Sequence, residues 1–110
     1  MKTSVMAGEL VTLDQVDCAI DGLKVKRVGR HTFEIVRHYV DDIVTLPDEA
    51  IFKAMLWTMH YCKVVVEGAA AAPVAALLHE LVPAPTDANV VCVLSGGNLN
   101  LSQIAGLTWN

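Results

Sequence analysis

The chain has 110 residues, enough for one domain or for part of one. Its net charge of −4 and its pI near 5.4 argue against nucleic acid and against an anionic membrane as partners. Hydrophobic residues make up 54% of the chain, and the seven glycines come in addition. That is more apolar material than a small free-standing domain needs. We therefore expect part of the apolar surface to lie against something outside this chain.

No targeting or membrane segment is predicted. Acidic residues follow Lys2 closely without an apolar core, so we expect no secretory signal. The uncharged stretch 88–110 is too rich in Asn, Ser and Gly to cross a membrane. The three cysteines, Cys18, Cys62 and Cys92, are odd in number and far apart, which predicts buried free thiols in a reducing cytoplasm.

The first half of the chain predicts short strands and one helix. Residues 11–13 and 23–26 have the composition of strands, with a turn at Asp21-Gly22 between them. A helix is expected to begin near Thr32, which can cap its N-terminus. The apolar stripe of this helix comprises Phe33, Val36 and Val40.

The second half predicts two helices. A β-rich run at residues 43–46 precedes Pro47, which with two following acids starts the first of them. Its apolar stripe comprises Ile51, Met55, Met59, Cys62 and Val66. An alanine-rich helix over residues 69–81 has small side chains that allow close approach to a neighbour. Pro73 is compatible with this helix only in its first turn.

Residues 90–94, Val-Val-Cys-Val-Leu, form an unbroken apolar run. Strands that do not alternate are buried on both faces, which is typical of parallel sheets covered by helices. Helices separate this run from the β-rich run at residues 43–46, so the pattern indicates an α/β fold.

The run stops at Ser95-Gly96-Gly97-Asn98. In open α/β sheets, ligands bind outside the carboxyl ends of the strands. Two glycines let a ligand approach the backbone, while Ser95 and Asn98 supply a hydroxyl and an amide. On chemistry alone the loop fits an anion or the polar edge of a cofactor. A tight turn between strand and helix explains the same residues, and spacing alone favours it.

Four segments in order resemble the threonine/serine dehydratases, which are pyridoxal-phosphate-dependent enzymes of fold type II. The segments are VTLDQVDCAIDGLKVKRVG, TFEIVRHYVDDIVTL, VVVEGAAAAPVAAL and VVCVLSGGNLNLSQI. The likeness covers residues 6–107. It implies that residues 1–110 are the C-terminal third of a catalytic domain, with short parallel strands and packing helices.

The resemblance also implies cofactor contacts. Ser95 corresponds to the serine that hydrogen-bonds the pyridine nitrogen of pyridoxal 5'-phosphate. A neutral hydroxyl does not force that nitrogen to stay protonated, so the ring is a milder electron sink, which suits dehydration better than transamination. Gly96 and Gly97 would let the loop approach the ring, and Asn98 would brace it. Glu67 corresponds to a glutamate near the cofactor, although a plain helix-terminal acid explains it equally well.

Other parts of the family's site are missing. The lysine that carries the cofactor lies in a Ser-Phe-Lys-like motif, and none of the five lysines here has that setting. The resemblance places the phosphate loop and any metal site upstream as well. We therefore expect the isolated chain not to turn over threonine, its partner to be the missing N-terminal part of the catalytic domain, and the complete enzyme to be a homo-oligomer.

Internal departures from the family fit a diverged copy. Ala70 stands where the family usually has a glycine, Pro73 where it has a helix-compatible residue, and Ile20 precedes Asp21-Gly22 in place of alanine. These changes affect the expected geometry of the site more than the fold.

Two classes of function follow. The first is a fragment of a lyase that converts the amino acid L-threonine to 2-oxobutanoate; serine dehydratases and serine racemases share the same terminal motifs. The second is a non-catalytic remnant or interaction module. A Ser95 nucleophile is disfavoured, because no Gly-x-Ser-x-Gly elbow surrounds it. The four histidines lack the spacing of a zinc site and are expected to be solvated or at the core edge.

Overall fold

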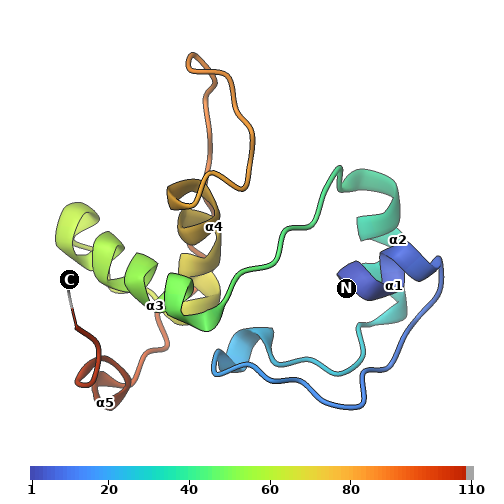
Figure 1. Ribbon diagram of the computed structural model, residues 1–110, viewed down its shortest axis with the longest axis horizontal. Helices are drawn as coiled ribbons and strands as arrows, with labels where there is room; N and C mark the ends of the chain where they lie inside the picture. The colour runs from blue at the N-terminus through green and yellow to red at the C-terminus, as the bar shows by residue number, and fades with distance from the viewer. Residues whose placement is uncertain (109–110) are drawn as a thin grey trace. The chain divides into compact units, whose positions relative to one another are not determined.

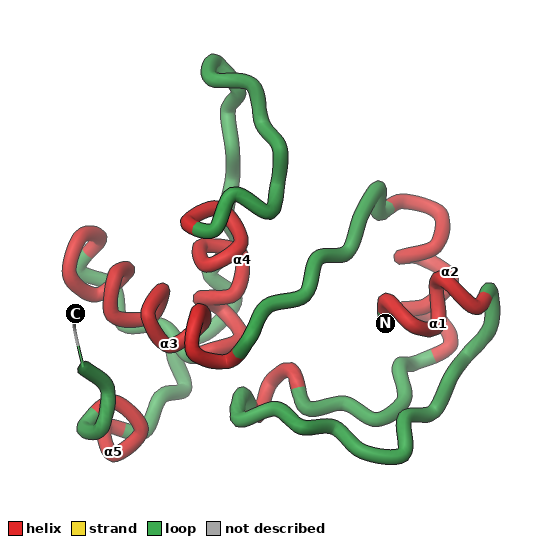
Figure 2. Tube along the Cα trace, viewed as in Figure 1, coloured by secondary structure: helices red, strands yellow, loops and turns green. Residues whose placement is uncertain are grey.

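The computed structural model describes residues 1–108, and the chain divides into two compact units, Met1–Thr45 and Leu46–Asn110. The regular elements of the described residues are all helical (Figure 2). None of the described helices combines the length and the apolar character needed to cross a lipid bilayer.

In the first unit, α1 (Lys2–Ala7) packs against α2 (Arg30–Tyr39) (Figure 1). The sequence pattern did not predict α1, which ends at Gly8 in the left-handed conformation with φ of 73°. The predicted cap at Thr32 is wrong. Gly29 is the N-cap, because its carbonyl already accepts the first helical hydrogen bond, from the Phe33 amide at 2.9 Å. Thr32 therefore lies inside the first turn.

The two strand-like pieces of the first unit meet at one antiparallel bridge, between Thr12 and Arg27. The Leu13 amide donates to the Lys26 carbonyl at 3.0 Å, and the Arg27 guanidinium donates to the Thr12 hydroxyl at 2.7 Å. The turn predicted at Asp21-Gly22 is confirmed as a single 3₁₀ turn, η1 (Asp21–Leu23). The pieces thus approach one another as predicted but do not extend into a ladder.

In the second unit, α3 (Asp48–Trp57) packs closely on α4 (Gly68–Leu78) (Figure 1). Pro47 precedes α3 and two acids occupy its first turn, as predicted. The buried residues are mostly small: Ala50, Ile51, Ala54 and Met55 from α3, and Ala70, Ala71, Ala75 and Ala76 from α4. Alanine faces on both helices allow their backbones to approach, which confirms the role predicted for the alanine-rich helix.

A π-helical turn, η2 (Thr58–Cys62), changes the course of the chain after α3. The wider turn alters the angular spacing of the side chains, and Lys63 with φ of 60° then ends the helix. The predicted apolar stripe therefore breaks. Cys62 is exposed, and Val66 is buried but lies beyond the helix.

Two features of α4 differ from prediction. Pro73 lies inside the helix, beyond its first turn, so the chain tolerates a proline that cannot donate to the Ala69 carbonyl. The helix ends at Leu78, three residues early. Glu80 adopts the left-handed conformation with φ of 55°, and the Leu81 amide donates to the Ala76 carbonyl at 2.9 Å. This pattern closes the helix as a Schellman motif.

Residues 79–100 connect α4 to α5 (Leu101–Ile104) without regular structure (Figure 2). The prediction that residues 90–94 form a buried strand is wrong for this chain: Val91 is 85% exposed and Val93 is 70% exposed. Residues 43–46 form no strand either. A strand needs a hydrogen-bonded neighbour, and among residues 1–108 the one recorded bridge is in the first unit.

Candidate cofactor site

The candidate residues come together at the N-terminus of α4. Glu67 is the N-cap of α4, with extended φ and ψ of −76° and 164°. The loop at residues 95–98 returns to this point, and the Glu67 amide donates to the Gly96 carbonyl at 3.1 Å. One backbone hydrogen bond therefore joins the two segments that the sequence singled out.

Gly96 lies directly beneath the Glu67 side chain. A Cβ added at Gly96 would stand 2.7 Å from Glu67 Oε1 and 3.0 Å from Glu67 Cδ. Contacts below 3.0 Å are essentially never seen for a real Cβ. The glycine is therefore needed at least in part by the carboxylate packed on it. This refines the sequence interpretation, which explained both glycines by the approach of a ligand.

Gly97 is constrained by backbone. An added Cβ would stand 2.9 Å from the carbonyl oxygen of Val65, and the Gly97 carbonyl accepts from the Leu99 amide at 2.8 Å. Among the described residues, Gly8 is the glycine with positive φ, so neither loop glycine is required for a left-handed turn. Close packing against the segment before α4 explains the pair.

A capping box fixes the far end of the loop. The Ser102 amide donates to Asn100 Oδ1 at 3.2 Å, and the Asn100 amide donates to Gln103 Oε1 at 3.0 Å, which together start α5. Sequence reasoning missed this support, although Asn-x-x-Gln ahead of a helix is a readable capping signal. The loop is thus held at Glu67 on one side and at Asn100 on the other.

Ser95 and Asn98 are exposed, while Glu67 is half-buried. The loop therefore presents one hydroxyl and one amide to the outside beside a carboxylate. That carboxylate opposes a bound anion, because like charges at short range repel. A neutral or hydrogen-bonding ring edge meets no such opposition. The donor set therefore fits the ring end of pyridoxal phosphate and does not fit its phosphate group.

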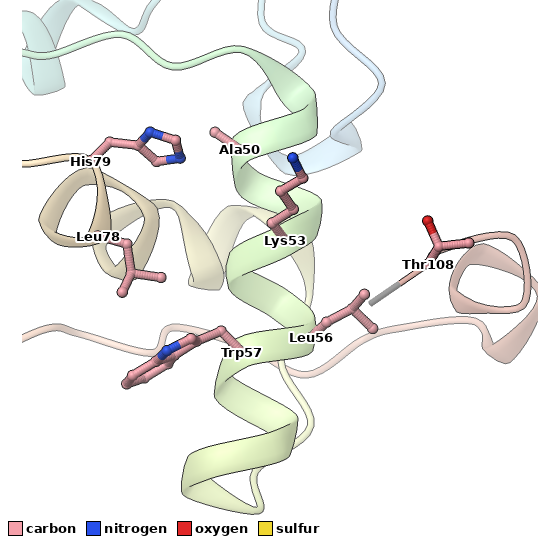
Figure 3. A pocket seen from close by; sticks show the side chains of 7 residues that line it. All are labelled: Ala50, Lys53, Leu56, Trp57, Leu78, His79 and Thr108. Carbon is pink, nitrogen blue, oxygen red and sulfur yellow. The ribbon is translucent and has the colours of Figure 1, made fainter. Parts of the chain in front are cut away.

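Two hollows of the second unit lie elsewhere. One has a volume of about 240 Å³ and is lined by Ala50, Lys53, Leu56, Trp57, Leu78, His79 and Thr108 (Figure 3). Another, of about 290 Å³, adjoins it along Lys53 and Leu56. Neither includes Ser95, Gly96 or Glu67. The candidate loop is consequently an open surface.

The histidine prediction is confirmed, since all four side chains are exposed. The cysteine prediction is confirmed only in part. All three thiols are free, but Cys62 is exposed and Cys18 and Cys92 are partly exposed. Cys62 ends the π-helical turn outside the α3–α4 interface, and Cys92 lies in the uncovered run 90–94, which explains why neither is buried.

Comparison with known proteins places the chain in a group. The family model described as pyridoxal-phosphate dependent enzyme matches residues 1–96, which include Ser95 and Gly96. The L-threonine ammonia-lyase of Geobacter sulfurreducens is 38% identical over 102 residues, covering 93% of this chain and 25% of that protein. The biosynthetic L-threonine dehydratase of Bacillus subtilis is 40% identical over 99 residues, covering 89% and 23%.

Two solved structures agree with this chain. A bacterial threonine deaminase, from T.th., superposes with a TM-score of 0.81 at 34% identity, covering 90% of this chain and 36% of that one. Maize serine racemase gives a TM-score of 0.82 at 31% identity, covering 94% and 34%. These likenesses confirm the fold class predicted from the sequence. The chain spans about a quarter of the curated relatives and about a third of these structures.

Proposed function

Because the chain belongs to the family of pyridoxal-phosphate dependent enzymes and has their α/β fold of type II, we propose that it forms the ring-nitrogen end of the cofactor site of a threonine/serine ammonia-lyase. The complete enzyme would release 2-oxobutanoate and ammonia from L-threonine. One observation carries the proposal: Glu67 and the Ser95–Asn98 loop, which are far apart in sequence, are joined by the Glu67–Gly96 hydrogen bond.

In this proposal Ser95 is the residue that meets the cofactor. Its exposed hydroxyl at the start of the loop would hydrogen-bond the ring nitrogen without placing a full charge beside it. Pyridoxal phosphate, when bound, supplies the electron sink for elimination of the β-hydroxyl. Glu67 and Gly97 hold the loop, Gly96 lies under the Glu67 carboxylate, and Asn98 lies next to Gly97 as a second exposed polar group.

We further propose that this chain is inactive by itself. The two lysines of the second unit have other contacts: Lys53 Nζ lies 2.9 Å from Glu49 Oε1, and Lys63 Nζ donates to the His60 carbonyl at 2.5 Å. Both ammonium groups therefore contact neighbouring residues of their own helical segment. The lysine that carries the cofactor, the phosphate grip and most substrate contacts would come from the N-terminal part of the catalytic domain, in a cytoplasmic homo-oligomer.

A chimaera tests the proposal. The matched stretch of the Bacillus subtilis dehydratase is replaced by this chain, and cofactor retention after dialysis and ammonia release from L-threonine are measured. We expect a working enzyme in which Ser95→Ala weakens cofactor retention by up to about tenfold, the loss of one hydrogen bond. Ser102→Ala, which changes an exposed serine outside the loop, is the matched control and should have no effect. Equal behaviour of the two variants would contradict the role of Ser95.

A second activity is favoured by the likeness to maize serine racemase, whose TM-score of 0.82 is close to the 0.81 of the deaminase. Racemisation would use the same ring-nitrogen contact and return the proton to the other face of the substrate carbon. Chiral analysis of serine incubated with the chimaera separates the two activities. Formation of D-serine without ammonia would favour the racemase; ammonia without D-serine would favour the lyase.

A further inference from the structure

Six exposed apolar side chains form a surface on the second unit that we call the valine face. Its members are Val64, Val65, Val90, Val91, Val93 and Leu94. Their exposed fractions run from 39% for Leu94 to 85% for Val91. Large apolar groups gathered in this way on a small protein mark an interaction surface.

The two segments of the valine face are joined at their C-terminal ends. The hydrogen bond from the Glu67 amide to the Gly96 carbonyl and the close approach of Gly97 to the Val65 carbonyl bring them together. Four of the six side chains belong to the run 90–94. Both segments are dominated by valine, which favours the strand conformation.

The backbone of the run 90–94 has no strand partner within residues 1–108. A β-prone segment with unpaired amides and carbonyls accepts an added strand, whose backbone pairs with it while alternate side chains fill the apolar surface. Residues 90–94 carry no charge, so the face selects an apolar strand over a charged one.

The amount of chain outside this sequence identifies the occupant. The deaminase and racemase structures are matched over only 36% and 34% of their length, although this chain is covered almost completely. About two-thirds of each relative's chain therefore has no counterpart here. We propose that the valine face docks an apolar strand from that remaining part of the catalytic domain, which completes the cofactor site. This inference rests on the proposed function, because it assigns the partner of the same site.

Binding in the absence of cofactor tests the inference. The probe is the polypeptide that precedes the matched stretch in the Bacillus subtilis dehydratase, co-expressed with this chain and quantified by pull-down and by surface plasmon resonance. We expect Val91→Lys and Val93→Lys to weaken binding by about tenfold or more, since a buried ammonium without a partner is costly. Val82→Lys, at an exposed valine outside the face, is the matched control and should bind within about twofold of the parent chain.

Four outcomes are decisive. Loss of binding in the face variants with retention in the control supports the inference. Equal binding by all variants, or no binding by the parent chain, overturns it. Self-association of the chain that Val91→Lys abolishes also overturns it, because the occupant is then a second copy. Binding through the face without cofactor retention in the chimaera leaves the docking inference standing and rejects the proposed function.

Discussion

Replacing Gly97 with alanine should disturb the candidate loop more than the same change at Gly96. The two glycines are adjacent and receive the same methyl group, but they face different atoms. At Gly97 the new Cβ meets the backbone carbonyl of Val65 at 2.9 Å. At Gly96 it meets the Glu67 carboxylate at 2.7 Å, which is the movable end of a side chain.

The magnitude follows from what can move. The Val65 contact is about 0.5 Å shorter than an ordinary van der Waals contact near 3.4 Å, so backbone must shift to accept Gly97→Ala. Overpacking of this kind costs about 1–3 kcal/mol. The Glu67 side chain can rotate away from Gly96→Ala. Alanine also lowers the entropy of the unfolded chain by roughly 0.4–1 kcal/mol at either position, so the Gly96 variant should be close to neutral.

Native-state hydrogen exchange at the Glu67 amide gives the direct measurement, because that amide donates to the Gly96 carbonyl. We expect Gly97→Ala to speed its exchange by about tenfold and Gly96→Ala to change it little. Combining Gly96→Ala with Glu67→Ala should relieve what strain remains, whereas no change at Glu67 should rescue Gly97→Ala. A larger effect at Gly96, or rescue of Gly97→Ala by Glu67→Ala, would refute the packing explanation of the glycine pair.

Three further changes have defined outcomes. Met55→Ala, at a side chain 1% exposed, should cost about 2–5 kcal/mol in urea unfolding, while Met6→Ala, at one 79% exposed, should be nearly neutral; equal losses would contradict the assigned core. The hydrogen bond and charge of Lys53 hold the pKa of Glu49 below its ordinary 4.5, so its contribution is present above that pH and lost as pH falls through the lowered value. Lys53→Gln should raise the Glu49 pKa in an NMR titration, and an unmoved midpoint would exclude the pair as the cause. Asn100→Ala should remove the capping box and cost about 1 kcal/mol of local stability, seen as faster amide exchange at the start of α5; unchanged exchange there would show that the cap is not formed.

Helices were the predictable part of the fold. Pro47 with two acids marks the start of α3, and alanines mark α4, because these signals act over a few residues. The π-helical turn after Trp57 was not predictable, since no local signal distinguishes it from continued helix. Residues 90–94 read as a buried strand because their composition reflects partners that the chain does not contain. Composition records the surroundings a segment is made for, and periodicity does not say whether they are present.

The candidate site was predicted from resemblance. Spacing alone favoured a plain turn at Ser95–Asn98 and left Glu67 as an ordinary helix-terminal acid. The contact between Glu67 and Gly96 depends on the return of the chain after a long irregular connection, which no short-range pattern encodes. Once the contact is known, the choice between an anion and a ring edge follows from the carboxylate beside the loop.

The central claim is that this chain supplies one end of a cofactor site and that the rest comes from elsewhere. Visible absorbance of pyridoxal phosphate retained after dialysis tests it most directly, measured on the chain alone and on the chimaera with the Bacillus subtilis dehydratase. The account predicts no retained band with the chain alone, a retained band with the chimaera, and a weakened band with its Ser95→Ala variant. A retained band of full strength with the chain alone, or none with the chimaera, would contradict it.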